Sequence, residues 1–221
     1  DTAYLGNIAG QNGWLDNAPN GAMTVADGVA AGNGSANALK LAKGPQATNV
    51  FGIAQAPLTP NATQVTVDTR IDDNGGANYF VRGLALTQTG ATLSFRVEFD
   101  YGGNIFVQNP VSGTFANTGT VWAIGNTWSS LDVKIVTDGV TSTLEYRYGG
   151  NLIGTTPALP AGLYFDLVQI GHDNFQNAFG SESFTGLPSA GFFDNLNVIP
   201  APGAMALLGL GGLVAGRRRR A

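Results

Sequence analysis

The sequence lacks cysteine, holds a single histidine, and has charge on only 12% of its 221 residues. Without cysteine, a disulfide framework, a thiolate nucleophile and a cysteine-based metal site are excluded. The low charge excludes a coiled coil and an acidic disordered chain. An apolar content of 43% and 32 glycines instead favour a folded domain with glycine-rich turns.

Acidic side chains outnumber basic ones over most of the chain. Four of the 11 basic residues lie at positions 217–220, so residues 1–216 carry 7 basic and all 15 acidic side chains, which gives 7 − 15 = −8. A surface of that sign repels phosphate groups, so nucleic acid is excluded as a partner.

Apolar and polar residues alternate from Gln64 onward. In Leu93–Asp100 every odd position is apolar, which places alternate side chains on one buried face. The same alternation buries Val65, Val67, Ile71, Leu131, Val133, Ile135, Leu144, Tyr146 and Tyr148. Asp138-Gly139 lies between two such runs and predicts a tight hairpin. Many short strands with no helical period predict an all-β, two-sheet antiparallel sandwich.

Two stretches resemble the concanavalin A-like (laminin-G-like) jelly rolls. From Trp128 the order Trp-x-x-Leu-x-Val-x-Ile, a turn, and Thr-Leu-Glu-Tyr-Arg-Tyr-Gly-Gly-Asn-Leu-Ile-Gly is similar to their central hairpins, and Phe192–Val198 is similar to their last strand. The resemblance implies a jelly roll over about residues 38–198 within one β-sandwich domain, residues 1–198. Lectins, adhesion modules, glycan hydrolases and structural domains share this fold, so the fold alone does not choose the function.

The C-terminal segment has a different composition. A Pro/Gly linker at 199–203 contains Pro200, Ala201 and Pro202, and residues 204–221 hold an uncharged apolar run followed by basic residues. The basic residues are Arg217, Arg218, Arg219 and Arg220. This order resembles the PEP-CTERM sorting signal of exported bacterial proteins, with Ala201 in place of the usual glutamate.

That resemblance implies export, processing by a sorting protease of the exosortase type, and a place at the cell surface or outside the cell. We expect the apolar run to form a short helix that contacts the inner membrane transiently. From Ala204 to Gly216 it would be roughly 20 Å long, against about 30 Å for the bilayer core. Arginines after the run favour an orientation with the domain outside the cytoplasm.

Catalytic residues are not predicted. Glycan hydrolases of this fold often carry Glu-x-Asp-x-Glu on a strand, and here Glu98 and Asp100 fill the first two positions while Gly102 fills the third. Retaining hydrolysis needs two carboxyl groups about 5 Å apart. The alternative, which we prefer, is that these acids lie on the polar face of a strand.

A structural calcium site is predicted from oxygen-bearing side chains. Asp194 shares its period-two face with Phe192, Leu196 and Val198, and a carboxylate on an apolar face needs a partner or a metal. Further candidate ligands are Asp16, Asp72, Asp73 and Asn74. Calcium prefers six to eight oxygen ligands. The alternative for each Asp-Asn pair is an ordinary turn.

A carbohydrate contact is predicted at aromatic and polar residues near turns. Trp122, Tyr101 and Tyr148 are the aromatic residues that we expect to be exposed, and His172 with Asp173 is a candidate sugar contact. Core packing is the alternative for aromatic residues on strands.

These observations favour a non-enzymatic surface or matrix protein that binds exopolysaccharide. Two alternatives are a subunit that associates with itself into an extracellular fibre or layer, and a glycan hydrolase with an unrecognised acid pair.

Overall fold

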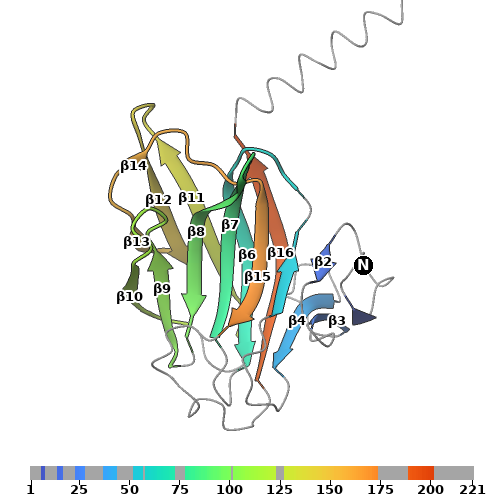
Figure 1. Cartoon of the computed structure of the whole chain (residues 1–221). Helices are drawn as coiled ribbons and strands as arrows, with labels where there is room; N and C mark the ends of the chain where they lie inside the picture. Colours follow the sequence, from blue (N-terminus) through green and yellow to red (C-terminus); the bar gives the residue numbers. More distant parts are fainter. Residues whose placement is uncertain are drawn as a thin grey trace, which may run out of the picture.

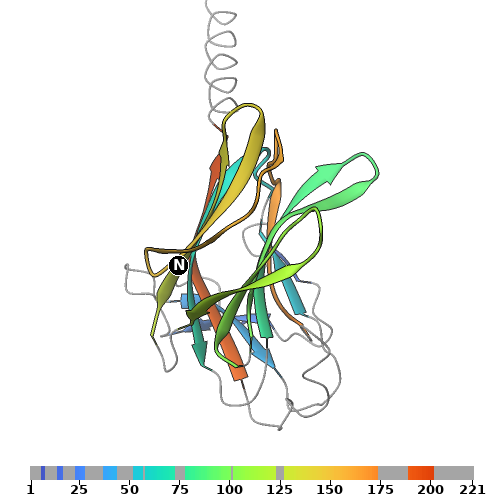
Figure 2. The same ribbon diagram turned by 90° about the vertical axis from the view of Figure 1, so that its left-hand side faces the viewer.

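Two layers of β-sheet make up the computed structural model of the chain (Figure 1). The structure describes residues 6–7, 14–16, 23–27, 37–43, 52–56, 58–72, 78–100, 102–122, 127–173 and 189–201. Within these ranges sixteen strands form two antiparallel sheets, and Figure 2 shows them from the side as two facing layers. The predicted all-β, two-sheet sandwich is therefore confirmed.

The first sheet has the order β1-β3-β4-β16-β6-β11-β12-β13, with β14 paired to β12. Its strands are β1 (Gly6–Asn7), β3 (Met23–Asp27), β4 (Asn37–Lys43), β6 (Ala62–Asp72), β11 (Ser129–Thr137), β12 (Thr141–Tyr148), β13 (Asn151–Thr155), β14 (Leu159–Pro160) and β16 (Ser189–Pro200).

The second sheet has the order β10-β9-β8-β7-β15-β5-β2. Its strands are β2 (Leu15–Asp16), β5 (Gly52–Gln55), β7 (Asn78–Thr87), β8 (Gly90–Phe99), β9 (Asn104–Gln108), β10 (Phe115–Val121) and β15 (Leu167–Asp173).

The core lies between the two sheets and follows the predicted alternation. Phe95, Val97 and Phe99 of β8 are fully buried, and the apolar positions of β6, β11 and β12 are buried with them. The rings of Phe95 and Phe165 meet edge to face, 5.2 Å between centroids. Burial of these side chains supplies the main driving force for folding.

The hairpin predicted at Asp138-Gly139 is present between β11 and β12. Gly139 has a φ of +89°, which glycine adopts without a steric penalty. The Asp138 carboxylate accepts the backbone N–H groups of Thr141 (2.7 Å) and Val140 (2.8 Å). These two hydrogen bonds, Thr141 first, lower the pKa of Asp138.

A β-bulge in β16 corrects the predicted position of Asp194. The register against β6 shifts between Asp194 and Asn197, and Asn195 has a φ of +54°. Phe193 belongs to the core, whereas Asp194 pairs with Asp68 and lies on the outer face. The extra residue changes the phase, so that Leu196 and Val198 pack against the core while Asp194 does not share their face.

Strand β16 continues through Pro200, and the Ala201 N–H donates to the Asn61 carbonyl at 2.8 Å. Pro202, the predicted apolar helix and Arg217 to Arg220 lie outside the described residues. Among the described residues, no helix has the length and apolar character needed to cross a membrane.

A close approach between β7 and β8 gives a first prediction. A Cβ added at Gly83 would lie 2.1 Å from Cε1 of Phe95. We expect Gly83→Ala to lower the free energy of unfolding by about 1–3 kcal/mol, because the Phe95 ring must leave its place. Gly154→Ala is the control, since its Cβ would lie 3.7 Å from Val107, an ordinary contact. Equal stabilities of the two variants in denaturant titrations would contradict this packing.

The buried hydroxyl of Tyr146 leads us to expect that the protein loses stability in alkali. Burial raises the pKa of its hydroxyl above the ordinary value. In the unfolded chain tyrosine ionises near pH ~10, so above that pH the folded state binds more protons and its stability falls as pH rises. Tyr146→Phe removes this contribution. We expect its unfolding free energy to fall less steeply above pH ~10, by up to ~1.4 kcal/mol per pH unit. If the unfolding free energies of the variant and the wild type fell equally steeply with pH above ~10, the result would contradict this prediction.

Candidate functional site

The outer face of the second sheet carries a row of polar and aromatic side chains that we call the polar row. Its members are directly opposite one another across six strands, β5, β15, β7, β8, β9 and β10. They are, in order, Gln55, Gln169, Arg82, Arg96, Gln108 and Phe115. All six side chains are half-buried.

Strand alternation places the polar row on the outer face. Val81, Val97 and Ile170 are buried in the core, and their sequence neighbours in the row therefore point the other way. Five steps of about 4.8 Å between strands make the row about 24 Å long. This length suits an extended polymer better than a small molecule.

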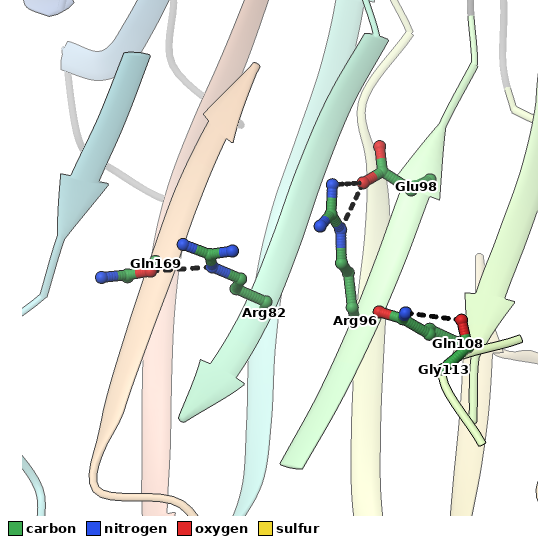
Figure 3. A network of polar contacts seen from close by, with 6 residues as sticks. All are labelled: Arg82, Arg96, Glu98, Gln108, Gly113 and Gln169. Atoms are coloured by element: carbon green, nitrogen blue, oxygen red, sulfur yellow. Dashed lines mark hydrogen bonds and ion pairs between the residues drawn. The ribbon is translucent and has the colours of Figure 1, made fainter. Parts of the chain in front are cut away.

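Hydrogen bonds fix one half of the row (Figure 3). Nε of Arg82 donates to Oε1 of Gln169 at 2.8 Å, and the amide nitrogen of Gln169 donates to Oε1 of Gln55 at 3.0 Å. At the other end the amide nitrogen of Gln108 donates to the Gly113 carbonyl at 2.8 Å. The polar groups are thus held in place by their neighbours.

Aromatic rings hold the two arginines of the row. The Arg82 and Arg96 guanidinium carbons lie 5.1 and 4.8 Å from the centre of the same Phe80 ring. Arg96 also lies 5.6 Å from the ring of Phe115. Such cation–π contacts favour the charged guanidinium and limit its orientation.

Glu98 forms an ion pair with Arg96 on the same strand. Nε and Nη2 of Arg96 both contact Oε1 of Glu98, and the Glu98 side chain is fully buried whereas that of Arg96 is 17% exposed. A carboxylate without solvent needs such a partner, because an unpaired buried charge is costly. Glu98 therefore positions Arg96.

Asp100, the second acid of the partial hydrolase motif, is bound in a turn. Its Oδ1 accepts the Asn104 backbone N–H at 2.6 Å, and its Oδ2 accepts the Asn104 side-chain amide at 3.0 Å. Both oxygens are thus engaged in joining β8 to β9. Gly102 at the third position is exposed and offers no carboxyl group.

The structure corrects three of the predicted carbohydrate contacts. Trp122 is 3% exposed, and its indole N–H donates to the Asp100 carbonyl at 2.8 Å, so this ring is part of the core. Tyr148 is buried against Phe99, because the alternation of β12 continues to its last residue. His172 is 3% exposed and lies edge-on to Tyr79 between the sheets.

The other predicted residues are placed only in part. Tyr101, Asp73 and Asn74 lie outside the described residues. For Asp16, Asp72 and Asp173 the structure describes the backbone, at the end of β2, β6 and β15 respectively. Within the described residues no group of three acidic or histidine side chains could hold a metal ion. The calcium site stays a prediction.

Sequence patterns alone did not reveal the polar row. Arg82 and Gln169 each interrupt a run of mostly apolar residues, 79–86 and 163–170. An isolated polar residue in such a run is the available signal for an outward functional face. The alignment of the two residues depends on strand pairing, which no local pattern specifies.

No protein-family model matches the sequence, and no curated protein matches it significantly. Several solved structures have a similar fold. A GH16 protein of a Bacteroides ovatus mixed-linkage glucan locus, in complex with a G4G4G3G product, has a TM-score of 0.57 at 9% identity, covering 89% of this chain and 99% of that one. A Bacillus licheniformis β-glucanase has a TM-score of 0.54 at 12% identity, covering 86% of this chain and 100% of the glucanase chain.

A sialidase gives a TM-score of 0.58 at 11% identity over 86% of this chain, but the match spans only 17% of the sialidase chain. At these identities the likeness shows the fold: a concanavalin A-like jelly roll, whose structural neighbours are mostly carbohydrate-active enzymes.

The Arg96–Glu98 pair yields a prediction on stability. We expect Arg96→Gln to lower the free energy of unfolding by about 3 kcal/mol, because it leaves the buried Glu98 carboxylate without its cation. The double variant Arg96→Gln/Glu98→Gln should recover most of that loss. Arg147→Gln is the matched control, since Arg147 contacts Glu145 at 3.6 Å with both side chains partly exposed. Its effect should stay below about 1 kcal/mol. A double variant no more stable than Arg96→Gln would show that the ion pair is not the cause.

Proposed function

We propose that this chain is an exported bacterial protein of the cell surface or extracellular matrix that binds exopolysaccharide without catalysis. The polar row of the second sheet is the proposed contact surface. The observation that carries the proposal is the alignment of amide, guanidinium and aromatic groups over about 24 Å of one rigid sheet.

The chemistry of the row suits a chain of sugar rings. Amide and guanidinium groups donate hydrogen bonds to hydroxyl and ring oxygens, and the glutamine carbonyls can accept them. Because Gln169, Gln55 and Arg82 are already held by one another, little side-chain entropy is lost when a polymer binds. The fold supports the same reading, since structural neighbours carry names that refer to glucan and alginate.

Two observations support a binding role over hydrolysis. The Glu98 carboxylate is paired with Arg96, and both oxygens of Asp100 are bound by Asn104. Neither acid is placed as a proton donor beside a nucleophile. Export and display rest on the resemblance of about residues 198–221 to a sorting signal, which also implies processing by an exosortase-type protease.

Affinity electrophoresis of the purified protein in gels containing neutral and acidic polysaccharides, with and without calcium, tests this function. We expect retardation by at least one polymer and no release of reducing ends or unsaturated sugars. Gln169→Ala should weaken the retardation, because it removes the link between Gln55 and Arg82.

Gln64→Ala is the matched control. Gln64 also donates to a cross-strand neighbour, Asp132 at 3.1 Å, but lies on the first sheet. If Gln169→Ala and Gln64→Ala weakened the retardation equally, the polar row would not be the contact surface. No retardation by any polymer, or release of sugar fragments, would refute the proposal of a non-catalytic binder.

A further inference from the structure

The centre of the polar row combines two like charges in adjacent strands. Arg82 and Arg96 are directly opposite one another in the pairing of β7 with β8. Opposite residues on one face of an antiparallel pair have Cβ atoms about 5 Å apart, and like charges there destabilise the sheet. Both guanidinium groups lie over the same Phe80 ring, with Arg82 directed toward Gln169 and Arg96 toward Glu98 (Figure 3).

The repulsion between the two arginines is offset in part by Glu98. It is the one anionic side chain among the described residues of the polar row and of the register next to it. The neighbouring register runs Ile53, Gly171, Phe80, Glu98, Phe106 and Asn117. The two registers therefore hold two positive charges and one negative charge, 2 − 1 = +1, in a chain of net charge −4. Glu98 forms its ion pair with Arg96.

We propose that the Arg82–Arg96 pair is a subsite for carboxylate groups, and that the polymer bound by the polar row is an acidic polysaccharide built from uronic acids. The inference rests on the proposed function and names the chemical class of its ligand. A carboxylate between the two guanidinium groups relieves their repulsion and accepts hydrogen bonds from their terminal Nη groups, because Nε of Arg82 and Nε of Arg96 already donate to Gln169 and Glu98.

The fixed orientation of both arginines favours contact with a carboxylate at a defined place. Gln169 fixes Nε of Arg82, and Glu98 with two aromatic rings fixes Arg96. The glutamines on either side of the pair face the adjoining sugar rings and their hydroxyl groups. Recognition thus combines one charged contact with neutral hydrogen bonds along the same line.

The rest of the chain carries a negative net charge, but salt screens it, so only charges close to the polymer affect binding. At physiological salt the Debye length is about 8 Å, so charges elsewhere on the surface are largely screened from a polymer on the row. The two arginines act at contact distance, where screening is weakest. Binding therefore depends on these two side chains more than on the net charge.

Matched polymers test the subsite with the intact protein at 0.15 M salt. Polygalacturonate carries a carboxylate on each sugar, its fully methyl-esterified form has none, and dextran sulfate carries a different anion. We expect polygalacturonate to bind at least about tenfold more tightly than its ester, the factor that one charge-assisted hydrogen bond supplies. Equal affinity for polygalacturonate and its ester, or for dextran sulfate and polygalacturonate, would overturn the assignment to carboxylates.

Variants locate the contact. Arg82→Gln should weaken polygalacturonate binding by about tenfold and weaken binding of the ester clearly less, because the ester offers no carboxylate to the guanidinium. Arg82→Lys keeps the charge and loses the planar guanidinium. Its affinity for polygalacturonate should lie between those of the wild type and Arg82→Gln. Arg147→Gln removes the same charge from the first sheet and should bind as the wild type does. Circular dichroism and the melting temperature confirm that each variant is folded, and Arg96→Gln/Glu98→Gln provides a second test of the pair with no buried charge left alone.

The outcomes separate this inference from the proposed function. Equal losses in Arg82→Gln and Arg147→Gln would refute the subsite. If a neutral polymer binds as tightly as polygalacturonate, and Gln169→Ala weakens that binding, the proposed function stands and the acidic ligand is refuted. Absence of binding to every polymer would refute both.

Discussion

The pairing of β7 with β8 and β15 is the constraint on which both the core and the candidate site depend. It places Val81 opposite Val97 on the inner face and, one residue further, Arg82 opposite Arg96 on the outer face. Because side chains alternate along a strand, these two results cannot be separated: a slip by one residue would bury the arginines and expose the valines. The close approach of Phe95 to Gly83 reinforces the register, since a larger residue at that point would displace the ring. Core packing thus fixes the geometry of the polar row.

The outer face of the second sheet differs from that of the first in the burial of its paired acid. On the first sheet, Lys40 and Arg70 also lie over one aromatic ring, Phe192, but the ion pair of Arg147 with Glu145 is partly exposed, which is usual for a solvated face. On the second sheet the arginines stack on Phe80 and Phe115, and Glu98 is fully buried beside them. Placing a buried acid and two opposed cations in one area costs stability, and the binding role that we propose gives a reason for this arrangement.

The strand alternation of residues 93–99 predicted the fold correctly because it is a local property of the sequence. Positions that depend on long-range pairing or on a bulge were not predicted. Asn195 adds one residue to β16 and so moves Asp194 to the outer face, which the period-two rule could not foresee. Trp122 was expected at the surface beside a turn, yet its N–H finds the Asp100 carbonyl and the ring is buried. The polar row joins residues up to 114 positions apart, Gln55 and Gln169, and only the folded sheet brings them together.

The most direct measurement of the central idea, that an acidic polymer lies across the Arg82–Arg96 pair, is an NMR titration of the arginine Nε–H signals with oligogalacturonate. We expect the signals of these two residues to shift together along one binding curve, while those of Arg70 and Arg147 on the first sheet stay in place. Shifts confined to the first sheet, or the same small shift for every arginine, would contradict it.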